Sequence, residues 1–388
     1  MQYAQGRDSQ LDLIRGVAIL GIVFLNVFGF AIPSWYSFDL HWHQQAISDL
    51  ELWLYQLQQL FLQGRFRTLL TLLFGVGLWL VAQPISLENT PDIPARQQQV
   101  KRRYLGLALF GFCHLSFFWT GDITLWYALS ALLVLAFGCL KLPAVSQWRL
   151  GITLVFITVL LNYAVAWASI VADPEVELGL SAEDILAEQA FQQGPILAIW
   201  QEMLWDNLLG FAGFCFGLSW LNIGTMLMGI SLYRQGFFQH GMKRWQEILL
   251  LTIAIILDTT GLLLADAHQN FANFWYDFSA LLMALVFCSW LVKWRNTCRL
   301  SRWLQLAGQM ALSLYFLQTL LFLVWFRVLL PDWYANSERW QLLLLASGVA
   351  ACSLAFAIIW RRFFKLGPLE WCWRKFYQAQ VNHEPKLN

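Results

Sequence analysis

Long apolar runs alternate with short polar connections along almost the whole chain. Many of the runs approach the ~20 residues that a helix needs to cross a bilayer. The pattern predicts ten membrane-spanning helices, at about 14–32, 54–82, 103–119, 123–140, 150–171, 205–232, 247–265, 271–292, 304–329 and 341–363. The predicted fold class is therefore all-α, a polytopic membrane helical bundle.

The distribution of basic residues predicts the orientation of this bundle. Alternate connections carry nearly all of the 25 Lys and Arg residues, whereas the opposite loops carry only Arg339. Basic loops are retained in the cytoplasm, so the side that carries them is predicted to be cytoplasmic. With ten spans, both termini lie on that side.

The same pattern predicts a single integral membrane domain over residues 1–380. Its first five spans lie in 1–171 and its last five in 205–365, with an acidic outer loop at 172–204 between them. Residues 366–388 form a cytoplasmic C-terminal tail in this prediction. The outer loop has no Lys or Arg, and it is either a solvated acidic surface or a lid that faces a substrate. A short amphipathic helix is predicted within it, at about 182–193.

Composition and charge narrow the class of partner. Hydrophobic residues make up 59% and charged residues 13% of the 388-residue chain, whereas roughly 25% of the residues in soluble domains are charged. The lipid bilayer is therefore the first expected partner. The net charge of +1 creates no strong field for recruiting nucleic acid, so a nucleic-acid partner is not expected.

Polar residues within spans are costly and are the first candidates for function. Asp12 and Arg15 share a helix face at the start of the first span. They form either an anchoring ion pair or a site at which Arg15 binds an anionic donor from the cytoplasm. Asn26 lies about 11 residues further on, ~16 Å along a helix. It either joins two helices or contacts a substrate.

The second apolar run contains two arginines directly after a glycine, at Gly64, Arg65 and Arg67. As one helix the run would be ~43 Å long, more than the ~30 Å hydrocarbon core. The helix therefore either extends out of the membrane or breaks near Gly64 beside a polar cavity. In a cavity the arginines would bind a phosphate or carboxylate; otherwise they snorkel to the outer interface.

The third and fourth runs form a predicted hairpin with His114 before its outer turn and Asp122 within it. A carboxylate that holds one ring N–H of a histidine leaves the other nitrogen basic, as a general base requires. His114 and Asp122 are therefore the catalytic candidates. The alternative is that His114 bonds a neighbouring helix and Asp122 caps the fourth span. Tyr127, in the same hairpin, is a candidate for substrate binding.

The sequence predicts neither a metal site nor a tightly bound cofactor. His41 and His43 have the H-x-H spacing of metal ligands, but only Asp39 and Asp49 are near them as further ligands. No phosphate-binding loop, GxSxG elbow or HExxH motif is present. Any cofactor would therefore be a transient co-substrate.

Five segments in order along the chain resemble the YeiB-like family of bacterial inner-membrane proteins, whose C-terminal half is the domain of unknown function 418. The segments are LDLIRGVAILGIVFLN (11–26), GRFRTLLTLLFGVGL (64–78), GFCHLSFFWTGDITLWYAL (111–129), AGQMALSLYFLQTL (307–320) and RRFFKLGPLEWCWR (361–374). Gln309, Ser313 and Leu314 depart from the family's usual Arg, Thr and Asn. The resemblance implies a multi-pass protein of the bacterial inner (plasma) membrane.

That family is similar to a wider superfamily of transmembrane acyltransferases, including heparan-glucosaminide acetyltransferases and bacterial sugar O-acyltransferases. The resemblance implies transfer from acyl-CoA, as co-substrate, to a small-molecule, sugar or lipid acceptor. His114 would be the general base or acyl carrier and Asp122 its orienting group. The alternatives are a transporter or permease of a small organic anion, which the Gly-interrupted charged span suits, and a structural or assembly factor.

Overall fold

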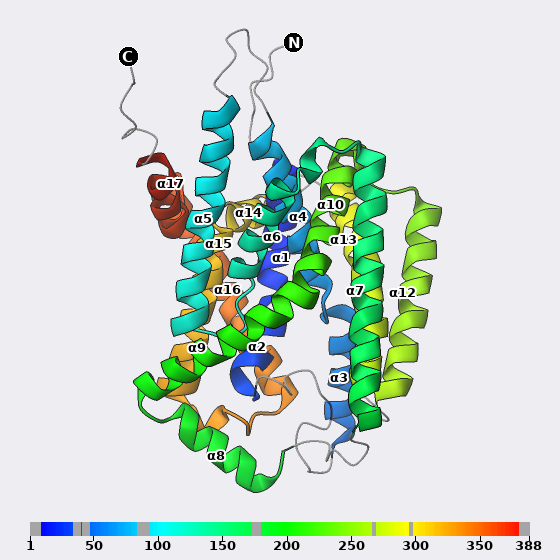
Figure 1. Ribbon diagram of the computed structural model, residues 1–388. Coiled ribbons are helices and arrows are strands. Elements are labelled where there is room, and N and C mark those ends of the chain that lie inside the picture. The colour runs from blue at the N-terminus through cyan, green and yellow to red at the C-terminus, as the bar shows by residue number, and fades with distance from the viewer. Residues whose placement is uncertain are drawn as a thin grey trace.

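The structure is a computed structural model that describes residues 9–33, 40, 47–83, 93–172, 180–265, 269–294 and 298–379. All regular elements in these ranges are helices, and most of them run along one common direction as a bundle (Figure 1). The all-α fold class is therefore confirmed.

The helices of the first half alternate long, bundle-forming segments with short connecting ones. They are α1 (Ser9–Gly21), α2 (Val23–Ala31), α3 (Asp49–Phe61), α4 (Arg65–Ala82), α5 (Ile93–Phe117), α6 (Thr124–Ala136), the 3₁₀ turn η2 (Cys139–Lys141), α7 (Ala144–Ala172) and α8 (Ala182–Gln192). The α8 helix confirms the short helix predicted in the acidic loop.

The helices of the second half include two π-helical turns within apolar segments. They are α9 (Ile196–Gly213), η3 (Phe214–Leu218), α10 (Ser219–Arg234), α11 (Phe237–His240), α12 (Arg244–Ala265), α13 (Gln269–Trp294), α14 (Arg299–Gln309), α15 (Ala311–Val324), η4 (Trp325–Leu329), η5 (Pro331–Trp333), α16 (Arg339–Phe363) and α17 (Pro368–Ala379). Helix α17 lies in the predicted tail.

Eight helical segments among the described residues are long and apolar enough to cross a membrane, so the chain is a multi-pass membrane protein. They are Ser9–Ala31, Asp49–Ala82, Ala144–Val165, Ile196–Arg234, Arg244–Leu264, Asn273–Trp294, Ala311–Leu329 and Arg339–Phe363. The other two predicted spans correspond to α5, which begins with a basic segment, and α6, whose 13 residues extend only ~20 Å. The total of ten spans stays a prediction.

The second predicted span breaks at the glycine that precedes its arginines. Helix α3 ends at Phe61 and α4 begins at Arg65. Between them Gly64 has a φ of +73°, and a Cβ there would lie 2.8 Å from the Cβ of Ala280. Only glycine adopts this backbone without strain while a neighbouring helix lies so close. Of the two alternatives that the sequence left open for this run, the structure has the break near Gly64.

The ninth predicted span divides into two helices at Met310, because α14 lies against α1 instead of continuing into α15. The two backbones approach so closely that only glycine fits. A Cβ on Gly16 would lie 1.8 Å from the carbonyl oxygen of Leu304, and one on Gly308 would lie 1.8 Å from that of Asp12. Small residues permit this kind of crossing in membrane proteins.

Helix α17 holds the new start of α15 through one carboxylate. Glu370 Oε1 accepts hydrogen bonds from the backbone N–H groups of Leu312 (2.8 Å) and Ser313 (3.1 Å). The Ser313 hydroxyl donates to the other oxygen. Trp373, further along α17, donates its ring N–H to the Arg103 carbonyl of α5 (2.8 Å). The predicted tail is therefore attached to the bundle at two points.

Replacing Glu370 with Gln should lower the free energy of unfolding by about 1 kcal/mol, because a neutral amide caps a helix N-terminus less well than a carboxylate. Thermal unfolding in detergent micelles measures the effect. Asp332→Asn, an exposed carboxylate-to-amide change with no described side-chain partner, is the control. Equal stability of the two variants would contradict the capping role of Glu370.

The two ends of the bundle differ in charge. Helix α17 and the start of α5 lie at one end, which we call the basic end, and α8 lies at the opposite, acidic end (Figure 1). Arg339, the exception among the loops predicted to be outer, is 1% exposed, and its Nε lies 2.7 Å from Glu51 Oε1. This isolated cation is thus neutralised within the protein.

Candidate functional site

The α5–α6 hairpin brings His114 and Asp122 together, and both side chains are fully buried. The Nδ1 atom of His114 lies 3.0 Å from Asp122 Oδ1, and the Leu125 backbone N–H donates to Oδ2 (3.0 Å). The two carboxylate oxygens thus make both contacts that the sequence left as alternatives. One holds the imidazole, and the other caps α6. Because a carboxylate only accepts, Nδ1 carries a hydrogen.

The second ring nitrogen of His114 faces α15. Its Nε2 atom lies 3.1 Å from the hydroxyl oxygen of Thr319, and this hydroxyl also lies 3.3 Å from the Tyr315 carbonyl. The nitrogen that a general base would use therefore has a hydroxyl group within hydrogen-bond distance. Thr319 is a polar residue of an apolar helix that we did not select from the sequence.

Aromatic rings enclose the imidazole. The rings of Phe110, on the same helix, and Phe118, directly after that helix, stack on it with centroids 6.3 and 6.0 Å away. Those of Tyr315 and Phe316 pack against it from α15, at 5.2 and 5.7 Å. These rings exclude water, which strengthens electrostatic interactions within the site.

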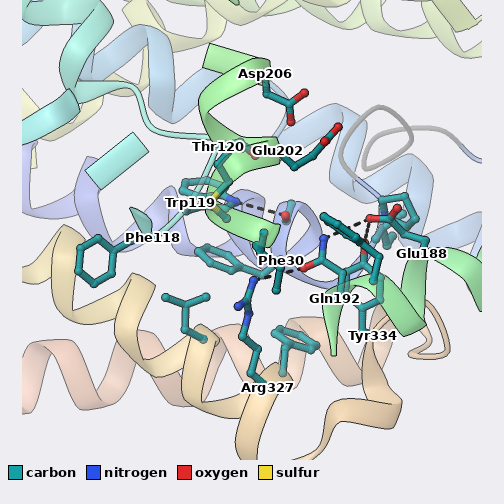
Figure 2. A pocket seen from close by; sticks show the side chains of 18 of the residues that line it. Phe30, Phe118, Trp119, Thr120, Glu188, Gln192, Glu202, Asp206, Arg327 and Tyr334 are labelled. Carbon is teal, nitrogen blue, oxygen red and sulfur yellow. Dashed lines mark hydrogen bonds between the residues drawn. The ribbon is translucent and has the colours of Figure 1, made fainter. Parts of the chain in front are cut away.

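A cavity of about 610 Å³ opens toward the acidic end, next to this enclosed pair. Its walls come from the end of α2, the α5–α6 turn, α8, α9 and the end of α15 (Figure 2). Phe30 and Trp119 stack within it at 4.5 Å, and the Trp119 ring N–H donates to the Gly29 carbonyl (3.2 Å). Its volume falls within the roughly 300–1,000 Å³ of small-molecule sites.

The cavity is predominantly acidic. Four carboxylates line it, from Asp184, Glu188, Glu202 and Asp206, whereas Arg327 is the only Lys or Arg in its described lining. Figure 2 shows Glu202 and Asp206 on one wall and Arg327 on another. This charge balance favours a neutral or cationic ligand over an anion. The α8 helix of the acidic loop also contributes to the wall, so part of the loop covers a cavity.

Hydrogen bonds join α8 to the segment between α15 and α16. The Tyr334 hydroxyl donates to Glu188 Oε1 (3.0 Å), which also accepts from the Gln192 side chain (3.1 Å). Arg327 in turn donates to Gln192 (3.3 Å). Burial raises the pKa of the Tyr334 hydroxyl, and the adjacent Glu188 carboxylate raises this pKa further. Tyr334 therefore remains a hydrogen-bond donor at neutral pH.

His114 lies one helical turn beneath the cavity wall. Phe118, four residues after His114 and directly after the end of α5, lines the cavity, as does Leu323, one turn after Thr319 on α15. One turn is ~5.4 Å. Phe118 lines the cavity and its ring stacks on His114, so this residue lies between the two.

Replacing Phe118 with Ala should expose His114 to reagents in the cavity. We expect carbethoxylation of His114 by diethyl pyrocarbonate to accelerate about tenfold. This factor corresponds to a free energy of exposing His114 to the cavity that is lower by ~1.4 kcal/mol. Peptide mass spectrometry measures the rate. Phe117→Ala, which removes the neighbouring ring that contacts Trp200 instead, should leave it unchanged. Equal rates in both variants would show that Phe118 does not separate His114 from the cavity.

The structure places Arg65 in a different cluster from His114. Its Nη2 atom donates to Asp258 Oδ2 of α12 (2.5 Å) and to the Ser279 hydroxyl of α13 (3.0 Å). Both side chains of the ion pair are 0% exposed. Arg65 thus contacts Asp258 of α12, Ser279 of α13 and the nearby Gln63 carbonyl. His114 instead contacts Asp122 of the α5–α6 turn and Thr319 of α15. Asp258, a single carboxylate within the seventh apolar run, was also missed from the sequence.

Arg67 and Tyr127 link α4 to the α5–α6 hairpin. The Arg67 guanidinium lies 3.5 Å from Asp277 and is partly exposed. Its carbonyl oxygen accepts a hydrogen bond from the Tyr127 hydroxyl (2.9 Å), which also lies 2.8 Å from the Thr71 hydroxyl. Tyr127 therefore holds two helices together, and its hydroxyl is buried.

The two candidates of the first span lie at different depths. Arg15 pairs with Asp12 at 3.0 Å and is 29% exposed, so the predicted ion pair is confirmed. Asn26 is half-buried on α2, one turn before Gly29 and Phe30 of the cavity wall. Its side chain makes no hydrogen bond with the part of the chain that the structure describes. His41 and His43 lie outside the described residues.

Several cavity residues were present in the sequence but not selected as a site. Glu202, Asp206, Arg327 and Tyr334 come from segments that are distant along the chain. Individually they have the patterns of a surface loop, a span end and an interfacial aromatic. The only sequence signal that could have grouped these residues was the acidic loop together with Arg327 at the end of a predicted span. Within the described ranges, no group of three or more His, Cys, Asp or Glu side chains could hold a metal ion.

Comparison with known proteins identifies relatives over nearly the whole chain. A family model described as "Protein of unknown function (DUF418)" matches residues 232–380. The chain is 29% identical to "Uncharacterized protein YeiB" of Escherichia coli (strain K12), over 95% of this chain and 96% of that protein. It is 24% identical to "Uncharacterized protein YxaH" of Bacillus subtilis (strain 168), over 95% and 93%. No solved structure matches.

Proposed function

The chain belongs to the YeiB-like family that contains the DUF418 region, and from this premise we propose that it is a membrane acyltransferase. It would move an acyl group from acyl-CoA to a hydroxyl- or amine-bearing acceptor, a small molecule, a sugar or a lipid headgroup. The observation that carries this proposal is the buried His114–Asp122 pair one helical turn beneath an acidic cavity.

In this proposal His114 acts as the general base. Asp122 holds Nδ1–H, so Nε2 is the nitrogen that accepts a proton. It takes the proton of the acceptor hydroxyl while the hydroxyl oxygen attacks the thioester carbonyl. The C–S bond then breaks, and the CoA thiolate leaves with that proton, giving an ester and free CoA. The Thr319 hydroxyl lies 3.1 Å from Nε2, so in this step it would give way to the acceptor hydroxyl.

The acceptor would bind in the acidic cavity. Four carboxylates beside a single arginine favour a neutral or cationic acceptor such as a sugar or an amino alcohol. The same balance disfavours the transport of a small organic anion, the alternative that the sequence left open. Asn26, one turn from the cavity wall, would contact the acceptor.

Acyl-CoA would reach the pair from the basic end. By the positive-inside rule we assign this end to the cytoplasm, where acyl-CoA is made, and the cavity to the outer face of the bacterial inner (plasma) membrane. Arg15 and the basic segment around Arg103 lie on the CoA side in this arrangement. CoA would be a passing co-substrate rather than a resident cofactor.

Release of free CoA from acyl-CoA by the purified protein tests the proposal. The protein in detergent, with a bacterial extract as the source of acceptor, should release thiol from acetyl-CoA or from a longer acyl-CoA. A thiol-reactive dye measures the release. If no acyl-CoA is consumed above the rate of an empty-vector preparation, the acyltransferase proposal is wrong.

A further inference from the structure

A second cavity, of about 380 Å³, lies apart from the site described above, and three arginines line it. Arg299 and Arg302 come from the first turn of α14 and Arg362 from the last turn of α16, while Trp303 completes the described lining. None of the acidic-cavity residues takes part in it. The α14 and α16 helices pack against each other.

The three arginines have no counter-charge among the residues that the structure describes. None of them forms an ion pair or a hydrogen bond with another described residue. Like charges that converge on one hollow repel each other. Two of them also lie at the N-terminus of α14, where the helix dipole is positive and destabilises a cation. An anion bound between them would reverse all of these unfavourable interactions.

The scaffold beneath the arginines is firmly held. Helix α14 packs backbone against backbone on α1, since a Cβ added to Gly308 would lie 1.8 Å from the Asp12 carbonyl oxygen. This close packing restricts the movement of α14. Arg361, the neighbour of Arg362, donates to Gln309 at the end of α14 (2.6 Å). The helices that carry the arginines are therefore positioned before any ligand binds, which limits the entropy lost on binding.

The surroundings of this cavity have the composition of a membrane interface. Trp303 is 38%, Leu300 45% and Phe363 75% exposed. Exposed aromatic and apolar side chains beside arginines are typical of the headgroup level of a bilayer. A guanidinium binds phosphate oxygens through a planar fork of N–H donors. Phosphate is thus the anionic group that this cavity fits best.

We propose that Arg299, Arg302 and Arg362 form a binding site for a phosphate group at the basic end of the bundle. The group comes either from an anionic lipid headgroup or from a soluble nucleotide such as CoA. The proposal stands whether or not the protein transfers acyl groups, since it depends only on the arginine-lined cavity. The site and the acidic cavity lie on different helices and can be tested separately.

Binding of two probes to the double variant Arg302→Gln/Arg362→Gln tests the site. The first probe is phosphatidylglycerol, whose retention on the protein is measured by native mass spectrometry after exchange from phosphatidylcholine nanodiscs. The second is CoA, measured by equilibrium dialysis. The double variant should weaken one of them on the order of tenfold, as expected when two cations are lost beside a phosphate. The probe affected identifies the source of the phosphate.

The control removes the same charge elsewhere. Arg149→Gln/Arg244→Gln replaces two exposed arginines of α7 and α12 that lie outside both cavities, and it should bind both probes like the original chain. Equal binding by the two double variants, for lipid and for CoA, would overturn the proposal. Thermal unfolding of both variants without lipid confirms that each is folded.

Discussion

Replacing His114 with Gln is expected to lower the rate of acyl transfer about 10²–10⁴-fold, the usual contribution of a general base. The amide of Gln can still bond Asp122 or Thr319, but it cannot take a proton from the acceptor. The free energy of unfolding should change less than in His114→Ala, which would leave a cavity among the aromatic rings. Release of CoA thiol, divided by the amount of folded protein, measures the effect.

Two further variants separate the roles of Asp122 from that of His114. Asp122→Asn keeps an oxygen that can cap α6 through Leu125 but loses the charge that holds Nδ1–H. We expect the rate to fall on the order of 10–100-fold, the size of the loss when a partner that orients a metal-bound histidine is removed. His240→Gln, an exposed histidine on α11, is the matched control and should retain full activity. Unchanged turnover in His114→Gln would exclude His114 as the base.

The second large effect is expected at the Arg65–Asp258 ion pair. Replacing Arg65 with Met leaves the Asp258 carboxylate buried without its cation, and breaking a buried pair in this way costs about 3–5 kcal/mol. The double variant Arg65→Met/Asp258→Leu should recover most of this loss, because no uncompensated charge remains. A double-mutant cycle of unfolding free energies in detergent measures the coupling.

The same double variant tests the sequence prediction that Arg65 binds substrate. If the ion pair serves the fold alone, the double variant should be as stable and as active as the original chain. A stable but inactive double variant would restore Arg65 as a functional residue. A single Arg65→Met variant within ~1 kcal/mol of the original chain would instead show that the buried pair contributes little.

The sequence predicted the features that depend on local pattern. A run longer than the hydrocarbon core left the break at Gly64 as one of two alternatives, and an amphipathic stretch in the acidic loop predicted α8. His114 and Asp122 were found because they are close along the chain and flank a predicted turn. In each case the interacting groups are neighbours in sequence.

The features that depend on contacts between distant helices were not predictable in the same way. Thr319 lies 205 residues from His114, and Asp258 lies 193 residues from Arg65. An apolar helix with one polar residue does not reveal which neighbour that residue faces. For the same reason the sequence did not reveal Asp258 as the partner of Arg65.

The division of the ninth span had a different cause. The glycines that bring α14 against α1 and the carboxylate of Glu370 at the start of α15 act together to end one helix at Gln309. The departures from the family pattern are part of this region. Gln309 accepts a hydrogen bond from Arg361 and Ser313 pairs with Glu370, so both residues support the junction of helices.

We propose that acyl groups pass from cytoplasmic acyl-CoA to an acceptor in the acidic cavity, with His114 as the general base. Sealed inside-out membrane vesicles test it most directly, because acetyl-CoA added outside reaches only the cytoplasmic face. Vesicles that contain the protein and an extract of extracytoplasmic solutes should accumulate radioactive acetyl label in acceptor, and vesicles with His114→Gln should not. Absence of labelled acceptor with the original chain, or equal labelling with His114→Gln, would contradict the claim.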